Sequence, residues 1–371
     1  MHRIVHIHSD FKFISEISKY KGEEFHNVLI ILGEKNEKNL KYHQSAIFLI
    51  PNNDNLPVII NYCKNADLVV LNDLDSYKRK IVSILPKEIT TAWRFFGYEL
   101  YARRTKYVLS EKTKEIINQR HRINLLKNFI NEIVNIRSKF LLSSAMKRID
   151  FFFCMYYTEY KNLKSLWKRL PPYINILVYK EKIEKRIYRK ENFYILGNNR
   201  SAYNNHLDII DLILHNNSIT KIKGKLFFNY GEVTRYSEAI KKVINNHPDY
   251  FELLEEFLTI EEFENIYKKA SAFVLNSYRQ MALSNIFTAL KYGVKIYLNS
   301  RNDAYDWLKD NHFIIYTIEE FESDYIHTNL KLEETNALHN MELLNKLFER
   351  NNPQVFQREL KTLLNNRNPS H

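Results

Sequence analysis

Short runs of apolar, β-branched residues alternate along the whole chain with segments of helical periodicity, and this alternation is the feature that most limits the fold. In the first half, the expected strands are residues 3–8, 27–32, 46–50, 58–60, 68–71 and 91–95. Short buried strands separated by helices are typical of parallel sheets. The sequence therefore predicts an α/β fold.

The same alternation starts again near Phe193. The expected strands of the second half are 193–196, 225–228, 272–275, 295–298 and 313–316, and the expected helices are 204–215, 236–245, 260–269 and 284–292. Thr259, with Glu262 three residues later, has the capping-box spacing of a helix start.

The length of 371 residues, at roughly 150 residues per domain, favours two domains. We expect them at 1–185 and 186–371, with the last helix able to pack back on the first domain. The connection is expected between Pro171 and Lys190, where two prolines, a short strand and a charge run follow one another. Two open parallel sheets that face each other would form a cleft at the carboxyl ends of their strands, where such folds place ligands.

Composition excludes several classes of protein. Hydrophobic residues make up 45% and charged residues 26%, which excludes a disordered chain. No apolar stretch approaches the ~20 residues of a membrane span, and no signal-peptide core follows Met1. Two isolated cysteines exclude a disulfide framework or a thiolate metal site. These observations indicate a soluble, cytoplasmic protein.

The net charge of +12 is concentrated in one segment. Residues 103–190 hold 22 Lys and Arg against 7 Asp and Glu, a local excess of 15. Within it, an apolar stripe at helical spacing is flanked by cations and followed by the aromatic run 151–157, which suits an anionic membrane surface. A core helix with a solvated basic back explains the stripe equally well. No nucleic-acid reader motif stands beside the cations, so we expect no nucleic-acid partner.

Glycine is scarce, with 7 residues, so each one is expected where the backbone needs it. Gly197 ends a strand and opens an Asn-rich turn before a helix. The backbone N–H groups at the start of a helix can bind an anion. Neither a dinucleotide fingerprint nor a P-loop lysine is present. An Asn-rich turn that only caps the helix remains the alternative.

Two further segments carry candidate chemistry. Arg279 follows the strand 272–275 and precedes a helix start at Ser284 and Asn285, so it is suited to binding phosphate. Its alternative is a surface loop whose arginine pairs with a carboxylate. Glu99 lies among aromatic residues in the segment 93–101 and is suited to sugar binding or general-base work. Its alternative is a core strand with an exposed glutamate.

Together these segments resemble the bacterial 4-acetamido-4,6-dideoxy-D-galactose (Fuc4NAc) transferases, glycosyltransferase family 56. Leu196-Gly-Asn198 with Asn204-Asn-His206 is similar to the family's L-G-N-S…S-N-N-H segment, and Asn229-Tyr-Gly231 to its S-Y-G turn. Arg279-Gln-Met-Ala-Leu-Ser-Asn285 resembles R-Q-Q-A-L-G-N, followed by the strand 295–298. In the first half, 93–101 resembles W-x-x-W-G-x-[DE]-L-Y.

The resemblance covers two thirds of the chain, and residues 102–190 and the last fifty match it loosely or not at all. Ser284 stands where the family has Gly, and Met281 where it has Gln. Both positions are expected close to the nucleotide, so base or sugar preference can differ here.

The resemblance implies a GT-B fold of two Rossmann-like domains, without metal or other cofactor. It implies transfer of the sugar from a dTDP donor, with a UDP-sugar as the alternative, to an undecaprenyl-diphosphate-linked glycan in surface-polysaccharide synthesis such as that of enterobacterial common antigen. The enzyme would then lie on the cytoplasmic face of the inner membrane as a peripheral protein.

Each role is carried onto matching positions. The donor-binding candidates are Gly197, Asn198, Asn204, Asn205, His206, Tyr230, Gly231, Arg279, Gln280, Ser284 and Asn285. The acceptor-binding candidates are Trp93, Arg94, Gly97 and Tyr101. The candidate bases are Glu99 first, then Asp10 and His8, which lie at the end of the first expected strand and not in a matching motif.

Three alternatives remain open. Asp73-Leu-Asp75 has the D-x-D spacing of metal-dependent GT-A glycosyltransferases, although Asn72 or Asp73 as a helix N-cap explains it and no metal is expected. A GT-B enzyme with a different donor and acceptor is the second. A non-catalytic nucleotide-sugar-binding or scaffold protein at the membrane is the third.

Overall fold

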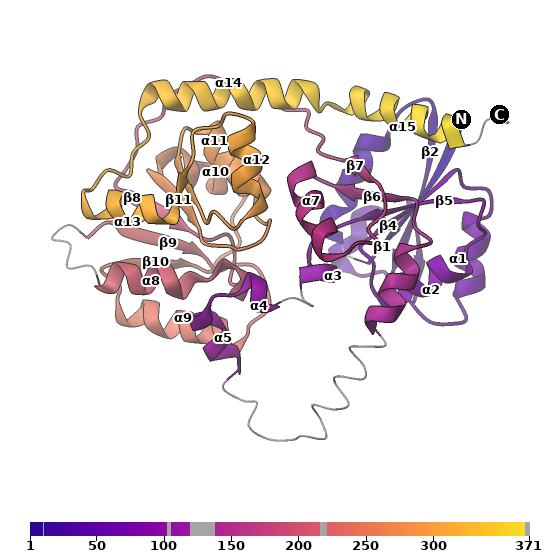
Figure 1. Cartoon of the computed structure of the whole chain (residues 1–371), viewed down its shortest axis with the longest axis horizontal. Coiled ribbons are helices and arrows are strands. Elements are labelled where there is room, and N and C mark those ends of the chain that lie inside the picture. The colour runs from indigo at the N-terminus through magenta and orange to yellow at the C-terminus, as the bar shows by residue number, and fades with distance from the viewer. Residues whose placement is uncertain (10, 102–104, 119–137, 216–220, 368–371) are drawn as a thin grey trace. The chain divides into compact units, whose positions relative to one another are not determined.

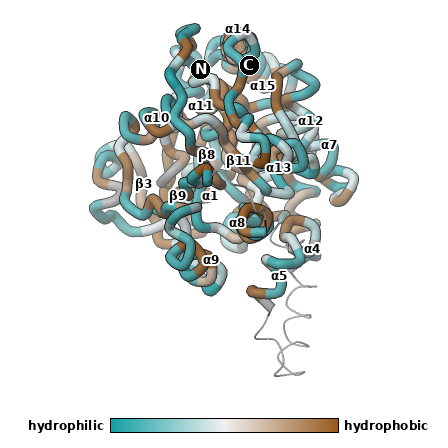
Figure 2. The backbone as a smooth tube through the Cα atoms, turned by 90° about the vertical axis from the view of Figure 1, so that its left-hand side faces the viewer, coloured by the Kyte–Doolittle hydropathy of each residue, from teal (hydrophilic) through white to brown (hydrophobic). Residues whose placement is uncertain are grey.

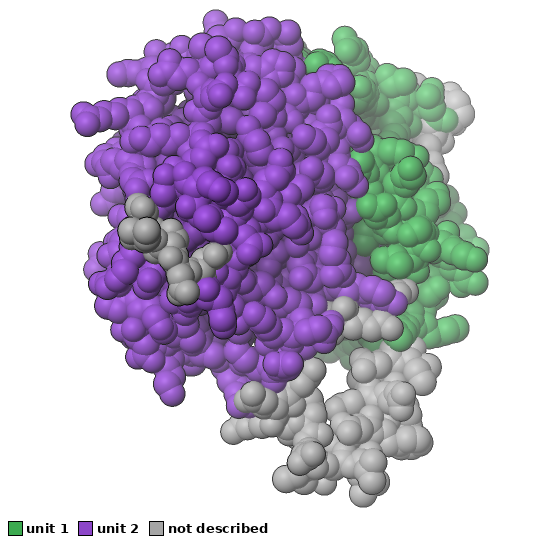
Figure 3. All heavy atoms as spheres, turned by 60° about the vertical axis from the view of Figure 1, so that its left-hand side comes forward, with its two compact units in different colours: residues 1–99, 124–180, 348–371 green, residues 100–123, 181–347 purple. Residues whose placement is uncertain are grey.

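The computed structural model describes residues 1–371 except 10, 102–104, 119–137, 216–220 and 368–371. The chain divides into two compact units, drawn in green and purple in Figure 3. Unit 1 consists of residues 1–99, 124–180 and 348–371, and unit 2 of residues 100–123 and 181–347. Each unit is built around one parallel sheet (Figure 1).

Unit 1 contains a seven-stranded sheet in the order β3-β2-β1-β4-β5-β6-β7, and every neighbouring pair is parallel. Its strands are β1 (His2–His8), β2 (Phe25–Leu32), β3 (Ala46–Leu49), β4 (Leu68–Asn72), β5 (Thr90–Arg94), β6 (Phe151–Cys154) and β7 (Tyr173–Asn175). The chain adds strands on one side of β1 and then, from β4 on, on the other. The carboxyl ends of β1 and β4 therefore form a topological switch point, where doubly wound sheets bind ligands.

The helices of this unit connect the strands and cover the sheet. They are the 3₁₀ helices η1 (Phe11–Tyr20) and η2 (Glu37–Tyr42), with α1 (Leu56–Cys63), α2 (Ser76–Ile84), α3 (Tyr98–Tyr101, which reaches into unit 2), α7 (Tyr157–Leu166), α15 (Pro353–Arg367) and residues 138–146. Among the described residues, no helix has both the length and the apolarity that a bilayer span requires.

Two expectations for the first half are wrong. Residues 58–60 belong to α1, because Pro57 stands in its first turn and Ile59 and Cys63, four residues apart, bury one helical face. The aromatic run that suited a membrane surface begins with β6, whose four residues are at most 9% exposed. This strand pairs with β5 along one edge and with β7 along the other, so it is an inner strand of the sheet. The apolar stripe from Ile123 to Ile136 falls outside the described residues.

Unit 2 contains a six-stranded parallel sheet in the order β10-β9-β8-β11-β12-β13. Its strands are β8 (Phe193–Leu196), β9 (Lys223–Phe227), β10 (Phe251–Leu254), β11 (Ala272–Leu275), β12 (Lys295–Leu298) and β13 (Tyr316–Thr317). The order reverses between β8 and β11, which places a second switch point at their carboxyl ends. The expected strand 313–316 is reduced to β13, and β10 was not expected.

Helices follow almost every strand of unit 2. They are α4 (Thr105–Val108), α5 (Glu111–Asn118), α8 (His206–His215), α9 (Arg235–Asn246), α10 (Ile260–Lys269), α11 (Leu283–Lys291), α12 (Asp303–Asp310), α13 (Ile318–Ile326) and α14 (Glu334–Arg350, whose last residues belong to unit 1), with the 3₁₀ turn η3 (Ala202–Asn204). α10 begins at the predicted capping box, since Thr259 and Glu262 exchange hydrogen bonds.

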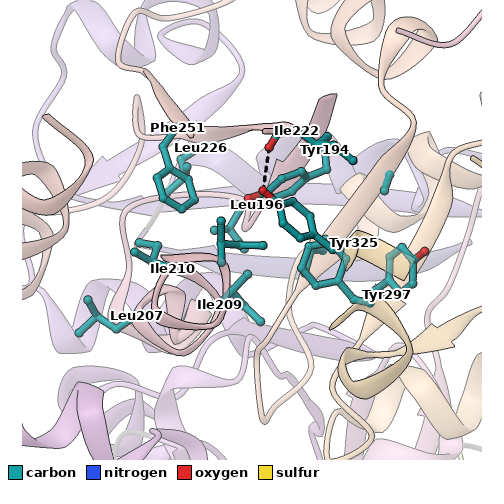
Figure 4. Packing of buried hydrophobic residues seen from close by; sticks show 14 of the residues in the cluster. Tyr194, Leu196, Leu207, Ile209, Ile210, Ile222, Leu226, Phe251, Tyr297 and Tyr325 are labelled. Atoms are coloured by element: carbon teal, nitrogen blue, oxygen red, sulfur yellow. Dashed lines mark hydrogen bonds between the residues drawn. The ribbon is translucent and has the colours of Figure 1, made fainter. Parts of the chain in front are cut away.

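The core of unit 2 lies between α8 and the sheet. Figure 4 shows Ile209 and Ile210 of α8 directed toward Leu196 and Leu226 on the neighbouring strands β8 and β9, and all four side chains are fully buried. Figure 2 shows the hydrophobic residues of α8 in brown. This packing fixes the start of α8 against the carboxyl end of β8, where the candidate site lies.

Two segments belong to a different unit from the residues that precede them in the sequence. Residues 100–123 belong to unit 2, where α5 lies against α8 and α9 (Figure 1) and the Ser110 amide donates to Asn205 Oδ1 at 2.9 Å. Residues 348–371 belong to unit 1, where α15 contributes Phe356, Leu360 and Leu364 to the core. The units thus differ from a simple division at residue 185.

We expect Leu360→Ala to lower the free energy of unfolding by about 2–4 kcal/mol, because it leaves a cavity in the core of unit 1. Urea unfolding measures the change. Glu359→Ala, at the neighbouring exposed position, is the matched control. Equal stabilities of the two variants would contradict the packing of α15 on this unit.

Candidate functional site

The candidate site of unit 2 lies on three loops that leave neighbouring strands. Residues 197–205 follow β8, residues 276–282 follow β11, and residues 299–302 follow β12. These strands are adjacent in the sheet and parallel, so neighbours are about 4.8 Å apart and the three loops emerge at the same edge. This edge contains the switch point of the unit.

Each loop carries one arginine. Arg200 comes four residues after the end of β8, Arg279 four after β11 and Arg301 three after β12. The Arg279 guanidinium lies 4.5 Å from the ring centroid of Tyr203, and that of Arg301 lies 4.0 Å from the ring of Tyr278.

A guanidinium stacked on an aromatic face still presents its N–H groups in the plane of the fork, which suits phosphate oxygens. The arrangement favours an anionic ligand at this edge.

The start of α11 adds further donors. Its first residue follows Ala282, whose φ of 60° is left-handed, and no side chain caps the helix there. The first N–H groups of a nine-residue helix, together with its dipole, favour an anion. Of the predicted pair, Ser284 is exposed in the first turn, whereas the side-chain Nδ2 of Asn285 donates to Tyr267 Oη of α10 at 2.9 Å.

Gly197 lies against the imidazole of His206. Its φ is +69°, and a Cβ at this position would approach His206 Nε2 to 2.5 Å and Asn204 Oδ1 to 3.0 Å. His206 is fully buried, which lowers its pKa to about 3 and keeps the ring neutral. Its Nε2 has no hydrogen-bond partner among the described residues. Only glycine fits here without displacing the imidazole.

The remaining residues that are predicted to bind the nucleotide-sugar donor divide into two groups. Asn204 and Asn205 hold the loops: Asn204 accepts from the Asn198 amide at 3.2 Å, and Asn205 donates to the Asn276 carbonyl at 3.1 Å. Tyr230 is 44% exposed on the loop after β9, and Gln280 is half-buried beside Arg279. The side chains of the second group are accessible to solvent.

Gly231 allows the loop after β9 to approach Arg200. Its φ is +104°, and a Cβ here would meet the Arg200 side chain at 3.1 Å. The Arg200 amide donates to the Tyr230 carbonyl at 3.1 Å, which ties the two loops together. Gly231 therefore positions one of the three arginines.

In unit 1, Glu99 is buried just beyond the carboxyl end of β5. It is 4% exposed, and its Oε1 accepts from Trp93 Nε1 at 3.2 Å and from the Phe96 amide at 3.3 Å. Burial raises the pKa of Glu99 to about 7, although these donors lower it. A carboxyl group with a pKa near neutrality is suited to general-base catalysis. The exposed glutamate of the alternative interpretation is not found.

The other residues of this segment have structural partners. Trp93 is fully buried in the sheet, and Arg94 makes a two-pronged pair with Glu16, at 3.2 Å from Nε and 3.1 Å from Nη2. Gly97 has a φ of +99° in the turn after β5. Tyr101 lies in unit 2, where its hydroxyl donates to Asp303 Oδ2 at 3.1 Å and its ring centroid is 5.4 Å from the Arg279 guanidinium.

The two remaining candidate bases are differently placed. His8 ends β1 and is 1% exposed, and burial lowers its pKa to about 3. Asp10 lies outside the described residues.

The D-x-D segment surrounds a buried lysine at the switch point. Lys78 Nζ donates to Asp73 Oδ1 at 2.7 Å, to Asp75 Oδ2 at 3.1 Å and to Ser9 Oγ at 2.6 Å. The N-cap of α2 is Asp75, which accepts from the Tyr77 and Lys78 amides, so the predicted cap at Asn72 or Asp73 is wrong. An N-cap oxygen must reach the second and third helical N–H groups, and Asp75 is the acid directly before the helix.

The described residues hold no group of three or more His, Cys, Asp or Glu that could ligate a metal ion. The D-x-D carboxylates instead bind the ammonium group of Lys78, with Asp73 at a left-handed φ of 71°.

Several site residues were not found from the sequence. The sequence analysis does not single out Arg200 or Arg301, yet they follow their strand ends by four and three residues, close to the four of Arg279. That interval is the signal that could have found them. Tyr203 and Lys78 carried no such signal, because only their tertiary contacts with Arg279 and with Asp73 define their roles.

Comparisons with solved structures bear on the fold. A sucrose-phosphate synthase from Thermosynechococcus elongatus matches with a TM-score of 0.69 at 9% identity, over 100% of both chains. Anabaena HepE in complex with UDP-glucose matches with a TM-score of 0.64 at 10% identity, over 99% of this chain and 100% of that one.

An alpha-glucosyltransferase in complex with UDP matches with a TM-score of 0.58 at 9% identity, over 98% of this chain and 100% of that one. Further structures of an alpha-glucosyltransferase contain DNA. No model of a known protein family matches the chain, and neither does any curated protein. The chain has the two-domain GT-B fold that was predicted.

The raised pKa of Glu99 predicts a pH-dependent stability. Its ordinary pKa is 4.5 and its folded value about 7, so the folded protein binds this proton more tightly than the unfolded chain. Stability from this group is therefore lost as pH rises from about 5 to 8, by about 3 kcal/mol in total. Relative to wild type, Glu99→Gln should become progressively more stable over that range in urea unfolding.

Glu88→Gln, at an exposed position, is the control and should follow the wild-type pH profile. A Glu99→Gln variant that stays parallel to wild type from pH 5 to 8 would contradict the raised pKa of Glu99.

Proposed function

We propose that the chain is a glycosyltransferase that uses a nucleotide-sugar donor. The observation that carries the proposal is the set of three arginines on successive strand ends of unit 2, together with the uncapped start of α11. A nucleoside diphosphate needs such cations and backbone donors. Structures of similar fold that contain UDP or UDP-glucose support this donor class.

The reaction requires two things of the protein, stabilisation of the charge on the leaving group and a base for the acceptor hydroxyl. The acceptor hydroxyl oxygen forms a bond to the anomeric carbon of the sugar while the bond from that carbon to the diphosphate oxygen breaks. Arg279, Arg200 and the first N–H groups of α11 stabilise the charge that develops on the departing nucleoside diphosphate. Glu99 accepts the proton of the acceptor hydroxyl, for which a pKa of about 7 is suited.

The finer assignment rests on the resemblance to the Fuc4NAc transferases. In this proposal the donor is a dTDP-linked deoxy-amino sugar such as Fuc4NAc, with UDP as the alternative nucleotide. The acceptor is an undecaprenyl-diphosphate-linked glycan in the synthesis of enterobacterial common antigen or an O-antigen-like polysaccharide. The Gly197–His206 contact and the Arg279 loop, which carry the motifs, both lie at the carboxyl edge of the sheet of unit 2.

Nucleotide binding tests the donor site. Arg279→Ala should weaken binding of dTDP or UDP about 10- to 100-fold, because it removes charge-assisted hydrogen bonds to phosphate. Isothermal titration calorimetry in EDTA measures the affinity. Arg235→Ala, at an exposed arginine at the start of α9, is the control. Unchanged affinity in Arg279→Ala would overturn the site.

Turnover separates an enzyme from a scaffold protein. Glu99→Ala should abolish sugar transfer while nucleotide binding is retained, because Glu99 acts on the acceptor and not on the donor. A chain that binds a nucleotide sugar and shows no transfer with any lipid-linked acceptor would favour the non-catalytic alternative.

We also propose a peripheral location on the cytoplasmic face of the bacterial inner membrane. In the described part of the basic segment, Phe140 is 73% exposed and Leu141 49% exposed. Arg79, Lys80 and Arg148 line a cavity of about 380 Å³ next to Leu141. Exposed apolar side chains beside cations suit an anionic lipid surface.

Vesicle binding tests this location. Binding to anionic vesicles should exceed binding to neutral ones and fall with salt, because each surface cation contributes about 1 kcal/mol. Phe140→Ser together with Leu141→Ser should weaken it in a sedimentation assay, whereas Phe257→Ser, at an exposed position of unit 2, is the control. Equal binding to both vesicle types at low salt would refute the proposal.

A further inference from the structure

A cavity of about 620 Å³ lies within unit 1, at the carboxyl ends of its strands. Its walls come from η1 after β1, from Met155 after β6, from Ile176–Lys180 after β7, and from the start of α15. In parallel α/β sheets this edge is where ligands bind. None of the donor-binding, acceptor-binding or catalytic candidates predicted from the sequence is among the lining residues.

Buried charges at the inner wall are unbalanced. Glu16 is paired with two cations: Arg94 holds it with two hydrogen bonds, and Lys19 Nζ donates to Glu16 Oε2 at 3.0 Å. Arg94 is 4% and Lys19 6% exposed. When Lys19 is protonated, one carboxylate faces two cations, and one buried positive charge has no compensating negative charge among these three groups.

Such an excess is costly to bury, and an anionic ligand would offset it. Burial and the neighbouring Arg94 both lower the pKa of Lys19, whereas Glu16 raises it. A second anion beside Lys19 would favour its charged form.

The mouth of the cavity is cationic and one wall is apolar. Lys21 and Lys180 are exposed and line it, and Glu16 is the one acidic residue among the described lining residues. Met155, Ile176 and Val178 form the apolar wall. Ammonium groups beside an apolar surface match an amphiphile that joins a phosphate group to a hydrocarbon chain.

We propose that this cavity binds the diphosphate group of an amphiphilic acceptor, with its hydrocarbon chain along Met155, Ile176 and Val178. Lys19, Lys21 and Lys180 bind the phosphate oxygens. The proposal rests on the proposed function for the identity of the ligand as an acceptor, and it names the place in unit 1 that holds its charged group. The cavity is separate from the nucleotide site, since all its lining residues belong to unit 1.

Binding of small diphosphates to the full chain tests the proposal. The probes are octyl diphosphate, inorganic pyrophosphate, octanol and UDP, each titrated by calorimetry in EDTA. Octyl diphosphate should bind more tightly than pyrophosphate, and octanol should not bind measurably. The double variant Lys21→Gln/Lys180→Gln should weaken octyl diphosphate at least about tenfold and leave UDP affinity unchanged, because both lysines are exposed and lie outside the nucleotide site.

Two controls separate specific binding from general charge loss. Lys64→Gln/Lys87→Gln removes the same charge from exposed positions of unit 1 that do not line the cavity, and it should bind all probes as wild type does. Val178→Thr changes the apolar wall at nearly constant shape. It should weaken octyl diphosphate about threefold and leave pyrophosphate unchanged.

The outcomes are distinct. If pyrophosphate binds as tightly as octyl diphosphate, the ligand is a free phosphate and the amphiphile is ruled out. If neither binds while UDP does, the cavity proposal fails and the proposed function stands. If octyl diphosphate binds and UDP does not, the cavity proposal stands as a diphosphate site and the proposed function fails. If Lys21→Gln/Lys180→Gln and Lys64→Gln/Lys87→Gln lose the same affinity for octyl diphosphate, the proposal is also overturned.

Discussion

The parallel direction of all strands within each sheet is the constraint on which the rest of the structure depends. Parallel strands end at a common edge, so residues distant in sequence meet there without any long loop. In unit 2 this brings Arg200, Arg279 and Arg301 onto adjacent strand ends. In unit 1 it brings Ser9, after β1, to the Asp75 and Lys78 pair after β4.

Burial and neighbouring charges then determine the pKa values of the carboxyl groups of unit 1. Glu99 and Glu16 are both carboxylates of unit 1, yet their pKa values move in opposite directions. Glu99 has hydrogen-bond donors without a full positive charge, so burial dominates and raises its pKa. Glu16 lies between Arg94 and Lys19, and these cations hold its pKa well below the ordinary value despite burial. The first carboxyl is suited to accepting a proton and the second to holding charges in place.

The sequence predicted most strands of both sheets, because buried parallel strands are short apolar runs that hardly depend on context. It failed where periodicity is ambiguous. Residues 58–60 read as a strand, but Pro57 and the spacing of Ile59 and Cys63 make a helix. The strand-turn-helix pattern identifies the motif at Gly197, whereas no local pattern indicates the partner of Arg94, since Glu16 lies far away in sequence. Contacts between distant segments leave no local pattern to read.

The assignment of segments to units has a consequence for how this chain can be divided. Unit 1 is made of three stretches of sequence and unit 2 of two, so neither is encoded as one continuous piece. A cut near residue 180 would release a first fragment that lacks the α15 side chains of its own core and carries α5 without α8 and α9 to cover it. Excised halves are therefore poor starting points for domain-swapped chimaeras. Circular permutants that keep every stretch, or grafts of single strand-end loops, respect the architecture better.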